Sequence, residues 1–120
     1  MKAWLILTTV LFSSCVVSEK SMVGSYFYQS KRNSEFSSSI KLNDDLSFAY
    51  RSTESIVPDP IIRGKWKVTG SKLILVPDDP SSIRKGWRIW KARKNSVLES
   101  TRNGYRKLVR LKTHYTLGFN

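Results

Sequence analysis

The side chains able to do chemistry in this sequence are few and scattered. Its 120 residues contain a single histidine, His114, and a single cysteine, Cys15. Nucleophilic catalysis needs a base beside the nucleophile, and a lone histidine in a basic segment is more often a surface residue than a catalyst. A metal site needs several histidine, cysteine or carboxylate ligands together. We therefore expect a protein that is not an enzyme and that holds no metal ion or other cofactor.

Two pairs of adjacent carboxylates remain as candidates for acid–base chemistry, Asp44-Asp45 and Asp78-Asp79. Neighbouring residues of a strand point to opposite faces, so neither pair forms a ready acid–base dyad. Both pairs lie in turn-like segments, where aspartate is common because its side chain bonds the local backbone. The second pair stands between Pro77 and Pro80 and could hold calcium weakly, but nothing else in the chain supports such a site.

The strongest chemical signal is a basic segment at the end of the sequence. Residues 81–120 carry eleven lysines and arginines against one acid, Glu99, whereas residues 1–80 carry ten basic and eight acidic residues. The aromatic residues among these cations are Trp87, Trp90 and Tyr105. Either the aromatics form the core and the cations are solvated outside, or the segment forms a face that attracts anions. For the second alternative, the candidate anion-binding residues are Arg88, Lys91, Arg110 and Lys112.

The elements that must position these residues are strands. After residue 21, apolar and polar residues alternate in short runs, which is typical of half-buried strands. The runs are 22–28, 36–42, 46–50, 63–69, 73–76, 86–93, 97–101 and 105–112. Turn signals separate several of them, at residues 43–45, 70–71 and 103–104. No segment after the first fourteen residues shows a convincing helical stripe.

This pattern predicts an all-β fold, a small closed antiparallel meander barrel of about eight short strands. A small sandwich is the alternative. We favour the barrel because closure removes the exposed strand edges that a sandwich would leave.

The first residues have the composition of a secretory signal peptide. Met1-Lys2 supplies a positive charge, residues 3–12 are apolar, and two small residues precede Cys15. The apolar run is too short to cross a bilayer, which needs roughly 20 residues. Residues 11–15 resemble the lipobox of bacterial lipoproteins, with Phe12 in place of the usual leucine. The resemblance implies cleavage before Cys15 and lipid attachment to it; the alternative is a soluble secreted protein with an incidental cysteine.

These features divide the chain into a lipoprotein signal peptide over residues 1–14, a lipidated tether over residues 15–21 and a barrel domain over residues 22–120. Because Cys15 is the sole cysteine, it has no partner for a disulfide within the chain. Val16, rather than an aspartate, follows it, which among bacterial lipoproteins indicates the outer membrane. We expect a lipid anchor, such as palmitate, in the cell envelope, on the periplasmic side of the outer membrane.

Half of the barrel domain resembles small lipocalin-like bacterial lipoprotein domains. Their pattern is G-x-Y, then L-x-L-N-x-D-G-x-F-x-Y, then G-x-W-x-x-x-G-x-x-L-x-L, and the matching segments are residues 23–26, 40–50 and 63–75. Leu46 stands where the pattern has glycine. The resemblance implies a meander of β-strands, because its motifs are turn residues and inward aromatics, and it implies no particular ligand.

The function that these observations favour is that of a non-enzymatic, membrane-anchored envelope lipoprotein whose basic face binds an anionic envelope component. Anionic lipid, lipopolysaccharide and acidic glycan are the partners nearest to such a protein, whereas nucleic acid is not expected there. The alternative is a carrier of a small apolar ligand in the barrel interior. An interior filled by Tyr26, Phe48 and Trp66 would favour a solid core over a carrier.

Overall fold

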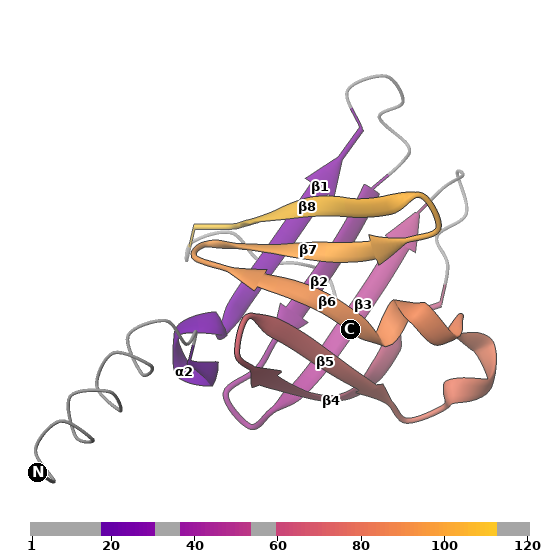
Figure 1. Ribbon diagram of the computed structural model, residues 1–120, viewed down its shortest axis with the longest axis horizontal. Helices are drawn as coiled ribbons and strands as arrows, with labels where there is room; N and C mark the ends of the chain where they lie inside the picture. Colours follow the sequence, from indigo (N-terminus) through magenta and orange to yellow (C-terminus); the bar gives the residue numbers. More distant parts are fainter. Residues whose placement is uncertain (1–17, 31–36, 54–59, 113–120) are drawn as a thin grey trace, which may run out of the picture.

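The fold is a closed antiparallel β-barrel (Figure 1). The structure, a computed structural model, describes residues 18–30, 37–53 and 60–112, and within them eight strands follow one another around the barrel in sequence order. The strands are β1 (Gly24–Gln29), β2 (Ser37–Leu42), β3 (Ser47–Thr53), β4 (Ile62–Thr69), β5 (Lys72–Pro77), β6 (Ile89–Arg93), β7 (Ser96–Thr101) and β8 (Gly104–Arg110). The barrel closes where β1 pairs with β8, Tyr26 opposite Arg110 and Phe27 opposite Val109. The predicted fold class is confirmed.

The barrel interior contains the apolar core, because inward residues alternate with outward ones along each strand. The three aromatics that were expected to mark a solid core, Tyr26, Phe48 and Trp66, are all buried. Other large side chains of the same cluster are Met22, Ile40, Leu42, Leu73, Leu75, Trp90, Val97 and Leu108. This part of the interior is therefore filled by the protein's own side chains.

A short turn after β2 and a glycine within β4 fit the backbone of neighbouring strands together. In the turn after β2, the Leu46 amide donates to the Asn43 carbonyl at 3.1 Å, and Leu46 has a φ of +68°. Leucine thus adopts the left-handed conformation that glycine adopts without strain, at the position where the lipocalin-like pattern has glycine. At Gly64, an added Cβ would lie 2.2 Å from the Val76 carbonyl oxygen, so only glycine fits between β4 and β5 there.

A short helix, α2 (Glu19–Met22), precedes the first strand, in a region that shows no helical pattern in the sequence and where residues 15–21 were expected to form a tether. The Ser18 hydroxyl caps it by accepting from the Ser21 amide at 3.2 Å. Glu19 accepts a hydrogen bond from the Val68 amide of β4 at 3.1 Å, and Met22 is buried in the core. The part of the chain that packs on the barrel therefore includes residues 18–21, because tertiary contacts stabilise a helix too short to form alone.

The segment predicted as a strand over residues 86–93 is a strand only from Ile89. Before β6 the chain forms two 3-10 helices, η1 (Pro80–Ser82) and η2 (Lys85–Arg88). Residues three apart in a strand point to opposite faces, yet Trp87 and Trp90 are both buried, with ring centroids 5.4 Å apart. The 3-10 turn at Trp87 allows both indoles to face inward, which is why a continuous strand was the wrong prediction.

Among the described residues, there is no helix with the length and apolar character needed to cross a membrane.

Candidate functional site

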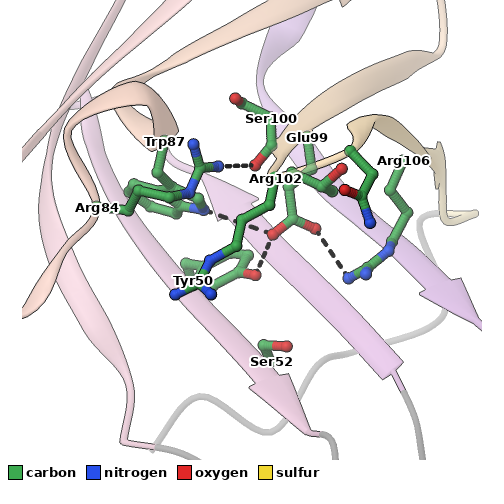
Figure 2. A pocket seen from close by; sticks show the side chains of 10 residues that line it. Tyr50, Ser52, Arg84, Trp87, Glu99, Ser100, Arg102 and Arg106 are labelled. Atoms are coloured by element: carbon green, nitrogen blue, oxygen red, sulfur yellow. Dashed lines mark hydrogen bonds and ion pairs between the residues drawn. The ribbon is translucent and has the colours of Figure 1, made fainter.

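An open pocket of about 590 Å³ lies at the end of the barrel where the β7–β8 hairpin turns and η2 approaches it (Figure 2). In Figure 1 this end is opposite to α2. Three parts of the chain line the pocket: the end of β3, the segment from Arg84 to Trp87, and the β7–β8 hairpin. The side chains that define its chemistry are Tyr50, Trp87, Glu99, Arg84, Arg102 and Arg106.

Glu99 is the buried centre of this pocket, with only 4% of its surface exposed. It faces inward because β7 alternates, with Val97 inward and Leu98 partly outward. Its carboxylate accepts three hydrogen bonds and makes one ion pair, so each oxygen has two partners. They are the Ser38 hydroxyl at 2.7 Å, the Tyr50 hydroxyl, the Trp87 indole N–H at 3.4 Å and the Arg106 guanidinium at 3.5 Å. A carboxylate is buried at low cost only with such donors, so this set of partners explains how Glu99 can lie inside the barrel.

An aromatic cluster forms the rigid floor beneath Glu99. The rings of Tyr50 and Trp87 meet edge to face at a centroid distance of 4.9 Å, and those of Tyr50 and Trp90 at 5.7 Å. Burial raises the pKa of the Tyr50 hydroxyl, and the negative charge of Glu99 raises it further. Tyr50 therefore stays protonated and remains a hydrogen-bond donor to Glu99 at neutral pH.

Three arginines surround the carboxylate at the mouth of the pocket (Figure 2). Arg84 donates to the Ser100 carbonyl at 2.9 Å, which ties the segment before η2 to β7. Arg106 lies opposite Glu99 across the β7–β8 pairing, with its guanidinium 5.3 Å from the Tyr28 ring. Arg102 lies in the turn and is exposed. With Glu99 the only acid in the lining, the pocket carries two net positive charges.

The pairing of Glu99 with Arg106 depends on the register of the β7–β8 hairpin. Asn103-Gly104 predicts a tight hairpin, and with these two residues at the centre of the turn Glu99 would lie opposite Leu108. In the structure the two loop residues are Arg102 and Asn103, so Thr101 lies opposite Gly104 and Glu99 opposite Arg106. The turn signal therefore predicts the hairpin but not the partner of Glu99.

The four predicted anion-binding residues lie in different elements and differ in their surroundings. Arg88 ends η2 and is half-buried, and Lys112 is exposed beyond β8. Lys91 lies on the outside of β6, with its ammonium 4.4 Å from the Tyr105 ring. Arg110 instead donates to the Val23 carbonyl at 2.9 Å and to the Tyr26 hydroxyl at 2.7 Å. It also donates to the Ser21 carbonyl.

Arg110 thus fastens α2 and β1 to β8, and reversing its charge would break these bonds. The remaining sequence candidates, Cys15 and His114, lie outside the described residues.

The outer face of β5–β8 carries a row of cations that the sequence did not reveal as a row. Strand pairing places Lys72 opposite Lys91, and Leu98 opposite both Lys91 and Lys107. Apolar side chains are exposed on the same strands: Ile89 (50%), Tyr105 (52%) and Val109 (53%). The only acid of these four strands is Glu99, which points inward. We call this surface, made of Lys72, Lys91, Lys107, Ile89, Tyr105 and Val109, the outer basic face.

Comparison with known proteins found no match: no protein family, no curated protein and no solved structure resembles this chain closely enough to be assigned to it. The fold is therefore described from its topology alone. It is a closed eight-stranded antiparallel barrel, of the kind that the lipocalin-like resemblance implies. Within the ranges that the structure describes, no three histidine, cysteine or carboxylate side chains gather as a metal site.

Proposed function

We propose that this protein is a non-enzymatic envelope lipoprotein, anchored by lipid on Cys15, whose outer basic face binds an anionic envelope surface. The observation that carries the proposal is the row of Lys72, Lys91 and Lys107 on β5, β6 and β8, with exposed apolar residues beside it and no acid among them. Like charges directly opposite each other on neighbouring strands, as at Lys72 and Lys91, destabilise a sheet, so such a row is favoured where an anionic partner neutralises it.

The composition of the outer basic face suits a lipid or lipopolysaccharide surface. A lysine close to an anionic leaflet contributes about 1 kcal/mol of binding free energy, and the three lysines together contribute a few kcal/mol at low salt. Ile89, Tyr105 and Val109 can enter the headgroup region, where apolar and amphipathic side chains are stabilised. The apolar-carrier alternative has less support, because Tyr26, Phe48 and Trp66 fill the interior and the pocket at the barrel end is lined by charged groups.

The lipid anchor is supported by the residues before and at Cys15. Mass spectrometry of the protein isolated from a bacterial envelope should find an N-terminal Cys15 that carries acyl chains. Fractionation of the membranes should find the protein in the outer membrane. An intact Met1 or an unmodified cysteine would contradict the anchor, and recovery in the inner membrane would contradict the sorting.

Vesicle binding tests the outer basic face. The protein would be residues 15–120 with Cys15→Ser, and the vesicles would contain either neutral lipid alone or neutral lipid with an anionic phospholipid. We expect cosedimentation with the anionic vesicles only, and release by added salt, because screening acts over roughly 8 Å at physiological ionic strength.

The variant Lys72→Glu/Lys107→Glu reverses two charges of the outer basic face. Its control is Lys41→Glu/Lys65→Glu, which makes the same change at two exposed lysines of β2 and β4. The first variant should lose most of the binding and the control should keep most of it. Equal losses would mean that net charge alone acts, and the outer basic face would then have no specific role.

A further inference from the structure

We propose that the pocket at the barrel end binds a small dissolved oxyanion, with a carboxylate or phosphate group held by Arg84, Arg102 and Arg106. The proposal goes beyond the surface-binding function, because these side chains lie inside the mouth of the barrel whereas the lysines of the outer basic face point away from it.

The size and charge of the pocket define the class of ligand. Its volume of about 590 Å³ falls within the range of small-molecule sites. Its lining has three guanidinium groups and one carboxylate. A guanidinium presents a planar fork of N–H donors that matches the two oxygens of a carboxylate or phosphate, so arginines at a pocket mouth favour oxyanions over halides or neutral ligands.

Two of the three arginines have donors that the fold does not use fully. Arg102 is exposed and makes no hydrogen bond or ion pair with another described residue that the structure records. Arg84 donates through Nη2 to the Ser100 carbonyl, a bond that positions the side chain at the mouth. A ligand anion can therefore bond to both without displacing a residue from the core.

Glu99 acts on the ligand through Arg106. Each of its oxygens already has two partners, and as an anion it repels an anionic ligand, so it does not bind the ligand itself. Instead, it competes with the ligand for Arg106. Ser38, Tyr50 and Trp87 hold the carboxylate in place while Arg106 donates N–H groups of its guanidinium to the bound anion.

The position of the pocket favours a dissolved ligand over a lipid headgroup of the anchoring leaflet. Ser18 is three positions after Cys15, and a chain of that length spans about 11 Å at most. Ser18 precedes α2, which lies at the end of the barrel opposite the pocket (Figure 1). If Cys15 holds the lipid, as proposed above, the leaflet that anchors it does not cover the pocket.

Titration with simple oxyanions tests the proposal on the same Cys15→Ser chain, residues 15–120. The probes are inorganic phosphate, glycerol 3-phosphate and succinate, and the readouts are calorimetry and tryptophan fluorescence, since Trp87 lines the pocket. We expect at least one probe to bind in the millimolar range or tighter, and Trp87→Phe to remove the fluorescence change but not the heat. The probe that binds most tightly identifies a phosphate or a carboxylate ligand.

Three variants assign the binding to the pocket. Arg102→Gln should weaken binding about tenfold, the usual effect of one lost charged hydrogen bond. The matched control, Arg93→Gln, removes an exposed arginine of β6 outside the pocket and should change binding less than about twofold. Glu99→Gln should tighten binding several-fold, because it removes the competitor for Arg106, whereas a purely structural Glu99 would not tighten it.

Three results would overturn the proposal: no probe binds more tightly than about 10 mM, Arg93→Gln weakens binding as much as Arg102→Gln, or Glu99→Gln weakens it while the variant remains folded by circular dichroism. The surface-binding proposal is tested separately, because Arg102→Gln should leave vesicle binding intact and Lys72→Glu/Lys107→Glu should leave probe binding intact.

Discussion

The ion pair between Glu99 and Arg106 predicts an unusual order of stabilities among its variants. The two charged atoms are 3.5 Å apart, and the side chains are 5% and 22% exposed, respectively. Coulomb's law at that distance, with an effective dielectric constant of about 20, gives roughly 5 kcal/mol of attraction. Desolvation and the partial exposure of Arg106 offset more than half of it, so we expect a coupling free energy of about 2 kcal/mol.

Arg106→Met keeps the apolar part of the side chain and leaves the Glu99 charge buried with neutral donors only. Its cost in unfolding free energy should be about 3 kcal/mol, because an uncompensated buried charge is strongly destabilising. Glu99→Gln should cost about 1 kcal/mol, since the amide keeps the shape of the carboxylate but offers a weaker acceptor to Tyr50 and Ser38. The double variant Glu99→Gln/Arg106→Met should then cost about 2 kcal/mol, less than Arg106→Met alone.

The measurement is urea unfolding of the four proteins, followed by tryptophan fluorescence and circular dichroism. Coincident transitions with equal denaturant slopes are needed, so that the unfolding free energies can be compared. If the cost of the double variant equals the sum of the single costs within about 0.5 kcal/mol, Glu99 and Arg106 are not coupled. The neutral donors would then be sufficient to hold the carboxylate.

Two further changes test the fold, and a third tests the pH dependence of the pocket. Leu46→Gly should raise the unfolding free energy by about 0.5 kcal/mol, because it relieves the positive φ at Leu46, whereas Asn95→Gly should change it little, because asparagine tolerates its φ of +63°. Gly64→Ala should cost more than about 3 kcal/mol, since the new methyl would meet backbone atoms of β5, whereas Gly70→Ala, with open space around it, should cost about 1 kcal/mol. Because the pKa of Tyr50 is raised in the folded state, the unfolded state releases the Tyr50 proton first above the ordinary tyrosine pKa of 10.0, and the folded state loses stability as pH rises. Melting temperatures measured between about pH 9 and 11 should therefore fall less steeply in Tyr50→Phe than in the unchanged protein.

The sequence was sufficient to predict the barrel because its turns are local. Asparagine, aspartate and glycine at residues 43–45, 70–71 and 103–104 act through short-range backbone preferences, and each of these signals lies at a turn between neighbouring strands in the structure. Alternation between the turns then indicated the strands. Closure followed from the cost of exposed edges, which does not depend on any particular residue.

The pocket and the short helix were not predicted because they depend on contacts between distant parts of the chain. Helix α2 is stabilised by the bond from Val68 to Glu19, whose residues are far apart in sequence. Glu99 is buried because Ser38, Tyr50 and Trp87 converge on it from three other elements. Alternation indicates which residues share a face of a strand, but it does not decide which face is inside.

In strand β8 the face that is turned inward is the one with fewer apolar residues. The pocket and the outer basic face both depend on this orientation. One face carries Tyr105, Lys107 and Val109, and the other carries Arg106, Leu108 and Arg110. The first has more apolar residues, yet Tyr105 and Val109 are exposed while Leu108 is buried. A one-residue shift would exchange the faces, but the register of the β7–β8 hairpin couples Arg106 to Glu99 and Leu108 to Val97.

The observed register therefore moves two arginines inward and two apolar side chains outward. Arg110 is stabilised by carbonyl oxygens and the Tyr26 hydroxyl, and Arg106 by a carboxylate that itself needs three other donors. The exposed Tyr105 and Val109 become part of the outer basic face beside Lys91 and Lys107. Departures from the apolar-inside pattern occur mainly at functional or strained sites. In β8 the departure gives Arg106 to the lining of the pocket, and Tyr105 and Val109 to the outer basic face.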